Sequence, residues 1–298
     1  MQAALFRQYG GPEVLEIAEA PEPHAGPGQV RVIVHAASVN PIDWKIRSGA
    51  MAAEAAPPAP VIGGFDAAGV VDEVGEGVTE ASLGDPVFGL GTSTQAEFAV
   101  LRSYVAKPAS LDWAQAAGLA VAAETSLRVF GLLGLTSGQT VLIDGAAGGV
   151  GSAGVQIAVA LGARVIATAS ERNHDYLRQL GATPIPYGDG LVDRVQQAAP
   201  QSVDAVFDVV GKTPIGELVS LVSDPAQVVS IANFDAAKAG AQVTSQGGDP
   251  KAALQRAAEL AAQGRLKLEV REFGLAEVAQ AHEISQQGHV RGKLVLVI

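Results

Sequence analysis

Hydrophobic and polar positions follow two different patterns along the chain. In the first third, short apolar runs alternate with turns rich in glycine and proline, and this pattern predicts short β-strands. Short strands with frequent turns favour a small distorted β-barrel. A loop in this region is expected to run into a short helix that begins at Trp44. The predicted strands cover residues 2–7, 14–18, 30–37, 61–75, 84–89, 96–100 and 104–107.

From Leu111 onwards apolar positions recur at helical spacing, and after Thr140 predicted strands and helices alternate. This alternation indicates a doubly wound parallel sheet, so the expected fold class is α/β. The last segments are expected to return to the first domain, which gives one domain over 1–118 and 266–298 and a second over 119–265. The expected helices cover 113–119, 124–133, 149–161, 172–180, 213–222, 250–263 and 275–287, and the strands cover 140–144, 164–169, 203–210, 227–232, 268–270 and 293–298.

A glycine-rich turn separates the predicted strand 140–144 from the predicted helix 149–161. The order strand, glycine turn, helix and strand within about thirty residues is the context that a dinucleotide-binding fingerprint requires. Glycines let backbone N–H groups approach a pyrophosphate, and the helix N-terminus adds free donors and the positive end of its dipole. Ala146 holds the first glycine position of the strict pattern, so a glycine turn of another α/β protein is the alternative. The predicted pyrophosphate site comprises Gly145, Ala146, Gly148, Gly149, Val150 and Gly151.

Composition narrows the classes of function that fit. The chain has 298 residues, of which 48% are hydrophobic and 17% are charged, so a disordered chain is excluded. A net charge of −11 disfavours nucleic acid and anionic membranes as partners. No apolar run of eighteen residues and no signal peptide are recognised, which predicts a soluble cytoplasmic protein. Cysteine is absent and the five histidines lack a metal-like spacing, so no zinc site is expected.

Six stretches spread over essentially the whole chain carry a family resemblance. They are AASVNPIDWKIRSG at 36–49, GFDAAGVV at 64–71, GDPVFG at 84–89, GAAGGVG at 145–151, DVVG at 208–211 and GHVRGKLVL at 288–296. Together they resemble the medium-chain dehydrogenase/reductase superfamily, and more closely its zinc-free quinone oxidoreductase branch. The resemblance implies a GroES-like β-barrel domain, a Rossmann domain, NADPH-dependent reduction of quinones or α,β-unsaturated carbonyls, and a homodimer. A zinc-free alcohol or aldehyde reductase and a catalytically idle NADPH-binding sensor remain open as alternatives.

By the same resemblance, Asn40 and Asp43 lie near the nicotinamide and are candidate catalytic residues, together with Thr125. An asparagine can bond an amide or a ribose hydroxyl with either end of its side chain. Asp43 can instead cap the short helix, and Thr125 can be an ordinary helix hydroxyl. Lys45 and Arg47 are interpreted as surface charges.

The sequence gives fewer indications about the residues that contact the substrate. Met51 stands where some relatives carry a tyrosine that faces the substrate, so a tyrosine acid from that position is excluded. The loop 50–60 is apolar and small-sided, which predicts an open hydrophobic pocket. No proton source is assigned, because water or a backbone N–H group can stabilise a developing enolate as well as any side chain. The physiological substrate is likewise left open.

The cofactor is predicted to be NADPH. Enzymes that use NAD usually place Asp or Glu at the end of the second strand, where it bonds the ribose hydroxyls. Here Ser170 takes that strand-end position, and Glu171, the competing signal for NADH, is expected to point to solvent. Arg172 can neutralise a 2′-phosphate to which Ser170 and Asn173 can donate. Tyr187 resembles a family tyrosine that lies near the adenosine phosphate.

Two further strand ends complete the predicted cofactor site. Asp208 is interpreted as holding a turn rather than acting in catalysis. The stretch 228–232 is expected near the edge of the sheet and motivates a homodimer through that sheet. The backbone groups expected to face the nicotinamide belong to Val210, Ser230, Ile231 and Ala232.

Overall fold

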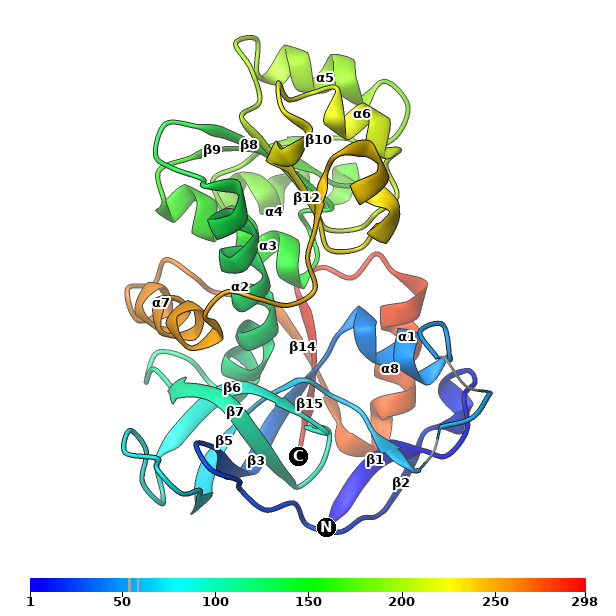
Figure 1. Ribbon diagram of the computed structural model, residues 1–298, viewed down its shortest axis with the longest axis vertical. Helices are drawn as coiled ribbons and strands as arrows, with labels where there is room; N and C mark the ends of the chain where they lie inside the picture. Colours follow the sequence, from blue (N-terminus) through cyan, green and yellow to red (C-terminus); the bar gives the residue numbers. More distant parts are fainter. Residues whose placement is uncertain (53–54, 58) are drawn as a thin grey trace. The chain divides into compact units, whose positions relative to one another are not determined.

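The computed structural model describes residues 1–52, 55–57 and 59–298, and in it the chain divides into two units (Figure 1). One unit contains Met1–Val121 and Leu254–Ile298, and the other contains Ala122–Ala253. The boundaries expected from the sequence lie at 118/119 and 265/266. In the structure the chain passes from one unit to the other inside two helices, α2 (Trp113–Leu133) and α7 (Pro250–Ala262). A boundary within a helix has no change of hydrophobic period to mark it.

The first unit contains the predicted β-barrel. Its larger sheet has the order β14-β15-β3-β5-β6-β7, and β3 also pairs with β7, so that four antiparallel strands close on themselves. Alternate residues of these strands point inwards and form an apolar core that includes Val32, Val71 and Leu101. A smaller sheet has the order β2-β1-β4. The strands are β1 (Gln2–Phe6), β2 (Glu16–Glu19), β3 (Val30–Val39), β4 (Val61–Ile62), β5 (Asp66–Val74), β6 (Pro86–Thr92), β7 (Phe98–Ala106), β14 (Val270–Gly274) and β15 (Lys293–Val297).

Several sequence-based boundaries in this unit are wrong. The strands expected at 14–18 and 268–270 are β2 (Glu16–Glu19) and β14 (Val270–Gly274). The two strands expected at 96–100 and 104–107 are the single strand β7. The strand expected over 61–75 is broken at Gly63 and Gly64, where the chain turns with a φ of +97° at Gly64. The short helix α1 (Pro41–Arg47) begins at Pro41 rather than Trp44, because proline fits the first turn of a helix. Helix α1 packs against α8 (Val278–Gln287).

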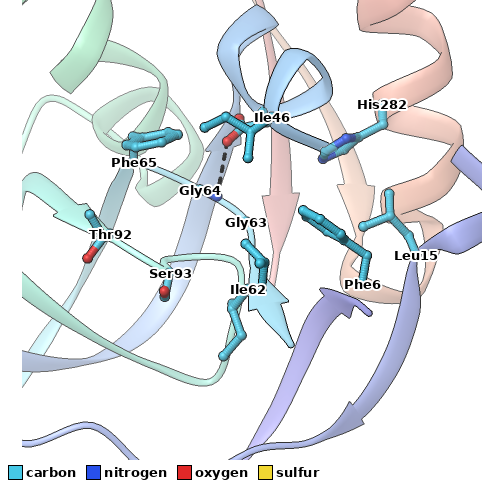
Figure 2. A pocket seen from close by; sticks show the side chains of 12 residues that line it. Phe6, Leu15, Ile46, Ile62, Gly63, Gly64, Phe65, Thr92, Ser93 and His282 are labelled. Atoms are coloured by element: carbon cyan, nitrogen blue, oxygen red, sulfur yellow. Dashed lines mark hydrogen bonds between the residues drawn. The ribbon is translucent and has the colours of Figure 1, made fainter. Parts of the chain in front are cut away.

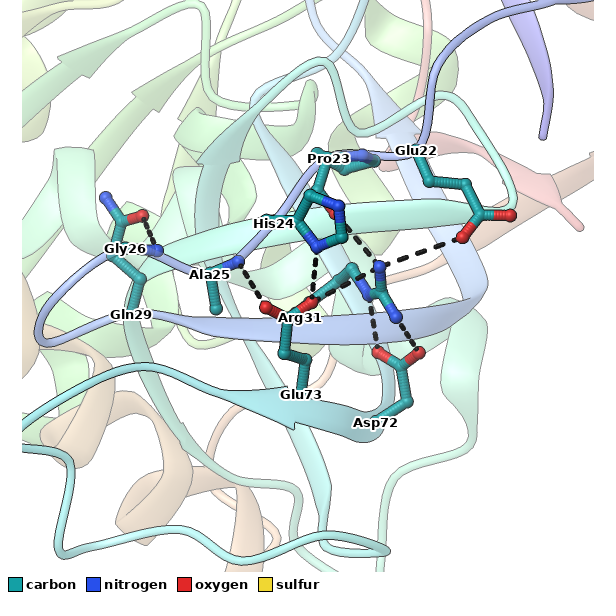
Figure 3. Close-up of polar contacts among 9 residues, drawn as sticks. All are labelled: Glu22, Pro23, His24, Ala25, Gly26, Gln29, Arg31, Asp72 and Glu73. Carbon is teal, nitrogen blue, oxygen red and sulfur yellow. Dashed lines mark hydrogen bonds and ion pairs between the residues drawn. The ribbon is translucent and has the colours of Figure 1, made fainter.

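Arg31 fixes the proline-rich segment that precedes β3 (Figure 3). Its Nε and Nη2 donate to the two carboxylate oxygens of Asp72 on β5, at 3.1 and 2.8 Å. Its Nη1 donates to the carbonyl oxygen of Pro23 and lies 3.2 Å from Glu73. Glu73 in turn accepts from the backbone N–H of Ala25. This ion-pair network ties residues 22–26 to the barrel on its outer side.

The second unit contains a six-stranded, fully parallel sheet with the order β10-β9-β8-β11-β12-β13. The order reverses direction at β8, as in a doubly wound fold. The strands are β8 (Thr140–Asp144), β9 (Arg164–Thr168), β10 (Thr183–Ile185), β11 (Ala205–Asp208), β12 (Val228–Ser230) and β13 (Gln242–Val243). The helices outside α2 and α7 are α3 (Gly149–Ala160), α4 (His174–Gln179), α5 (Leu191–Ala198) and α6 (Ile215–Val219).

The expected elements of the second unit occur in the expected order. Helix α5 and strands β10 and β13 are additional elements that are absent from the expected ones. The helical segments expected at 113–119 and 124–133 form one continuous helix, α2. Strand β13 pairs outside β12, so β13 forms the edge of the sheet and the stretch 228–232 lies one strand further in.

Helix α2 is also notable for its apolar composition. Among the described residues it is the one helix long and apolar enough to cross a membrane, and no such run is expected from the sequence. However, 72% of its most apolar stretch is buried inside the protein, which is typical of a core helix.

Candidate functional site

The glycine turn lies between β8 and α3, as predicted. Gly145 has a φ of +91°, a conformation that favours glycine, and Gly148 is the N-cap of α3. A Cβ atom at Gly151 would lie 2.4 Å from the carbonyl oxygen of Gly145 and 2.6 Å from the Cα of Ala146. The first turn of a helix has no internal partners for its N–H groups, so α3 presents free donors beside this turn. The residues therefore fit the pyrophosphate of a dinucleotide, which binds such a helix end.

Two side chains that the sequence reasoning missed hold this turn in place. The Gly145 N–H donates to Thr168 Oγ1 at 2.8 Å, and Thr168 Oγ1 donates to Asp144 Oδ1 at 2.5 Å. The second carboxylate oxygen of Asp144 accepts from Thr213 Oγ1 at 2.7 Å. Asp144 and Thr168 are fully enclosed and come from adjacent strand ends. Polar residues at the carboxyl ends of parallel strands are the sequence signal that points to such a network.

Asp208, the last residue of β11, holds the turn that follows this strand, as expected from the sequence. Its Oδ1 accepts from the N–H groups of Val210 and Gly211, at 3.2 and 2.7 Å, and its Oδ2 accepts from Ser230 Oγ at 2.7 Å. Burial raises the pKa of Asp208, while these hydrogen bonds oppose the shift.

The hydrogen bonds of Asp208 and Ser230 use backbone N–H groups that were expected to face the nicotinamide. Ser230 Oγ accepts from the N–H groups of Ala232 and Asn233, and the Ile231 N–H donates to the Asp208 carbonyl. The N–H groups at Val210, Ile231 and Ala232 are therefore already bonded within these loops. Val210 is 42% exposed, so its side chain is accessible.

The residues expected near the adenosine lie after β9 and β10. Glu171 and Arg172 are exposed in a single 3-10 turn, and Asn173 is buried with its Nδ2 donating to Ser170 Oγ at 3.2 Å. Tyr187 is 51% exposed. Sequence reasoning missed Arg194, which lies on α5.

Arg194 fixes the chain on both sides of Tyr187. Its guanidinium donates to the carbonyl oxygens of Pro186, Gly188 and Asp189, at 3.0, 2.8 and 2.7 Å.

In the first unit, Asn40 belongs to a buried polar cluster. Asn40 Nδ2 donates to Asp66 Oδ1 at 2.9 Å and to Ser38 Oγ at 3.1 Å. Asn40 Oδ1 accepts from Lys293 Nζ at 2.5 Å. Ser38 Oγ donates to Asp66 Oδ1, and Asp66 Oδ2 accepts from the N–H of Val121. Both amide protons of Asn40 are thus used inside the protein, which leaves one lone pair of Oδ1 for a ligand.

Asp43 bridges the start of α1 and the loop before β5. Its Oδ2 accepts from the Asn40 N–H at 2.7 Å, and its Oδ1 accepts from the Gly64 N–H at 3.0 Å. Asp43 is therefore not the cap of a helix that begins at Trp44; it lies in the first turn of α1 and accepts from the backbone N–H of the N-cap residue, Asn40. Burial, with a smaller effect of nearby Asp66, raises the pKa of Asp43 to about 7, although the two N–H bonds and Lys293 act in the opposite direction.

Asp43 also lines a pocket of about 190 Å³ in the first unit. Figure 2 shows Phe6, Leu15 and His282 on one side of this pocket and Phe65, Thr92 and Ser93 on the other. Its other lining residues are Ile46, Val61, Ile62, Gly63 and Gly64. Most of these lining residues are apolar, as predicted for the pocket. The prediction was based on the loop 50–60, of which residues 53, 54 and 58 lie outside the described part of the chain.

Arg47 is not a surface charge, and that interpretation is wrong. Its side chain is enclosed where α1 packs on α8, and its Nη2 donates to Gln286 Oε1 at 2.7 Å. Its Nε and Nη1 and both ring nitrogens of His282 have no hydrogen-bond partner among the described residues. Burial lowers the pKa of Arg47 and, together with the charge of Arg47, lowers the pKa of His282 to about 3.

Thr125 is the remaining candidate catalytic residue. Thr125 is buried on α2 with its hydroxyl 3.4 Å from Glu124 Oε2. His35 stacks on Trp113 with ring centroids 4.4 Å apart, and His24 lies 3.2 Å from Glu73. Among the described residues, no three His, Cys, Asp or Glu side chains form a group that could hold a metal ion.

Comparison with known proteins agrees with this architecture. Residues 26–119 match the family described as alcohol dehydrogenase GroES-like domain, and residues 180–296 match the family described as zinc-binding dehydrogenase. An NADPH-dependent alkenal/one oxidoreductase of Arabidopsis thaliana is 31% identical, over 99% of this chain and 79% of its own length. A quinone oxidoreductase of Rattus norvegicus is 33% identical, over 78% of this chain and 73% of its own length.

The solved structures give the same result. The structure of the quinone oxidoreductase from Coxiella burnetii has a TM-score of 0.88 and 32% identity, and the match covers 100% of this chain and 99% of that one. The predicted GroES-like domain and Rossmann-type parallel sheet are therefore confirmed. The chain belongs to the quinone oxidoreductase branch of the medium-chain dehydrogenase/reductase superfamily.

Proposed function

We propose that this protein is an NADPH-dependent, zinc-independent oxidoreductase that reduces quinones or α,β-unsaturated carbonyl compounds. The observation that carries the proposal is the turn from β8 to α3, where Gly151 packs against the Gly145 carbonyl and the first turn of α3 offers free N–H donors. The relatives named quinone oxidoreductase and alkenal/one oxidoreductase support the substrate class.

The dinucleotide would be held by the backbone of residues 145–151, and its nicotinamide supplies a hydride when the reduced cofactor is bound. Preference for NADPH is supported at the end of β9. Ser170 takes the place where an NAD enzyme carries an acidic residue, and Glu171 is exposed to solvent. Arg172 and Tyr187 are exposed near this end and are the side chains proposed to contact a 2′-phosphate.

Asp43 is the side chain proposed to supply a proton. Reduction of an enone or quinone needs a proton as well as a hydride, and Asp43 lines the pocket of the first unit. Its carboxyl group is fixed by two backbone N–H groups, and its pKa of about 7 leaves it partly protonated at neutral pH. The apolar residues around it favour a small hydrophobic substrate. Asn40, through the free lone pair of its Oδ1, and Thr125 remain proposed catalytic residues.

A screen of NADPH oxidation with quinones, enones and aldehydes tests the proposal. Turnover of quinones or enones is expected, with Gly148→Val as a control variant that should remain folded and lose cofactor binding. Turnover of aldehydes alone would instead identify a zinc-free alcohol or aldehyde reductase. Tight NADPH binding without any turnover would identify a catalytically idle sensor.

A further inference from the structure

Lys293 has an unusual position for a lysine. It is the first residue of β15, its side chain is only 5% exposed, and no motif considered from the sequence assigns it a role. Buried lysines are rare because an ammonium group loses its hydration, and they are retained when a specific partner compensates. Here the partner is Asn40 Oδ1, which lies 2.5 Å from Nζ.

This contact fixes the orientation of the Asn40 amide. An ammonium group can only donate, so Asn40 must present its oxygen to Lys293 and its NH₂ group to Ser38 and Asp66. A flipped amide would place N–H groups against Nζ. The backbone N–H of the same residue donates to Asp43 Oδ2, so Asn40 links the ammonium group to both buried carboxyl groups.

The two buried carboxyl groups of this cluster, those of Asp43 and Asp66, also need a nearby positive charge to balance them when they are ionised. Burial lowers the pKa of Lys293 and the two carboxylates oppose that shift, while Asp66 also raises the pKa of Asp43. Ser38, Asn40 and the N–H of Val121 supply neutral donors to Asp66, but Lys293 is the positive group of this cluster.

We infer that the Lys293 ammonium group is a built-in cation of this oxygen cluster and acts as a positioning residue for Asn40 and Asp43. Lys293 is not assigned contact with substrate or cofactor. It acts by holding the Asn40 amide in one orientation and by setting the charge balance around Asp43. The effect on turnover rests on the proposed function, whereas the role as a cation does not.

The inference is tested by truncating the Lys293 side chain and then adding the removed group to the buffer as a free organic cation. Lys293→Ala deletes a propylammonium unit, so n-propylammonium in the buffer restores both volume and charge, whereas 1-propanol restores similar volume without the charge. Thermal unfolding in the presence of each compound reports binding, because unfolding and refolding give access to the buried position. Lys238→Ala is the control, since Lys238 is an exposed lysine that pairs with Asp235.

The expected result is a lower Tm for Lys293→Ala, restored by n-propylammonium and not by 1-propanol, with no effect of either on Lys238→Ala. Turnover of Lys293→Ala should fall about ten- to a hundredfold, the scale of one charged hydrogen bond, and should recover with n-propylammonium. Equal rescue by 1-propanol would overturn the inference, because it would show a packing role. Recovery of Tm without recovery of turnover would overturn the positioning role.

Lys293→Met keeps the test valid if the alanine variant does not fold, because methionine fills the volume without the charge. The charged groups that act on Asp43 are Asp66 from β5 and Lys293 from β15, and His282 from α8 lines the same pocket. Loss of the ammonium group should therefore shift the pH midpoint of turnover upwards in Lys293→Met. An unchanged midpoint and unchanged kcat/KM would overturn the inference.

The two proposals can fail separately. If the wild-type protein turns over no quinone or enone, the proposed function fails, and the Tm experiment still decides whether Lys293 serves as the internal cation.

Discussion

The backbone of Gly151 lies directly against the carbonyl oxygen of Gly145, so that a Cβ atom at residue 151 would come within 2.4 Å of that oxygen. Gly151→Ala should therefore push α3 away from the turn, with a loss of about 1–3 kcal/mol in the free energy of unfolding. NADPH affinity should fall as well, because the turn and the helix end are proposed to hold its pyrophosphate. Denaturant unfolding and calorimetric titration measure the two effects.

Gly131→Ala is the matched control for this prediction. Gly131 lies inside α2, and an added Cβ there has no atom within 4 Å. Alanine is the better helix former, so this variant should gain up to about 1 kcal/mol and bind NADPH as the wild type does. Equal behaviour of the two variants would contradict the close packing at Gly151.

Arg172→Glu should weaken NADPH binding and leave NADH binding nearly unchanged. The exposed Arg172 is proposed to pair with the 2′-phosphate, which NADH lacks. The loss for NADPH should be about 1.5–3 kcal/mol, or roughly ten- to more than a hundredfold in affinity. Arg164→Glu makes the same charge change at the exposed first residue of β9 and should have little effect on either cofactor. A wild-type enzyme with equal kcat/KM for both cofactors would rule out the assignment.

Asp43 and His282 should give opposite pH dependences of stability. The pKa of Asp43 rises from 3.8 to about 7 on folding, so the folded state holds the extra proton between these values and stability falls as pH rises. The pKa of His282 falls from 6.5 to about 3, so the unfolded state holds the extra proton and stability rises with pH between these values. Where the two windows overlap, the contributions cancel.

Single variants separate these two contributions. His282→Leu should leave the Asp43 contribution uncompensated, so that stability falls between pH 4 and 6.5 more steeply than in the wild type, by up to about 1.4 kcal/mol per pH unit. Asp43→Asn should give the opposite change of slope. Urea unfolding across this pH range measures both, and the slope rather than the level is the readout because each substitution also alters packing. Identical slopes in the two variants would show that burial does not shift these pKa values.

The purified protein should contain no stoichiometric zinc, and a chelator should leave its turnover unchanged. The sequence has no cysteine, and the described residues contain no group of three ligand side chains. Elemental analysis of the protein as isolated provides the measurement. One zinc ion per chain would show that a metal site exists despite these observations.

We expect a homodimer in solution, formed through the parallel sheet of the second unit. The family resemblance motivates this expectation, and the edge strand β13 leaves one row of backbone N–H and C=O groups without a strand partner. Light scattering at micromolar concentration should give twice the mass of one chain. A monomeric mass would count against the dimer.

The sequence alone determined the glycine turn between β8 and α3 and the alternation of strands and helices around it. These features could be predicted because each depends on neighbours within about one strand and one helix. Hydrophobic period, glycine content and strand length are local signals. The turn-holding role of Asp208 could also be predicted, because the N–H groups that its carboxylate accepts from belong to Val210 and Gly211, two and three residues later.

The tertiary structure alone decided which polar residues are buried together. Lys293 and Asn40 are 253 positions apart, and Arg47 and Gln286 are 239 apart, so no local pattern relates them. Arg47 reads as a surface charge from the sequence because an arginine in a short helix usually faces water, and only the packing of α1 on α8 encloses it. A charged side chain has the same local signature whether it is solvated or buried beside a distant partner, and the energetic difference arises only when the chain folds.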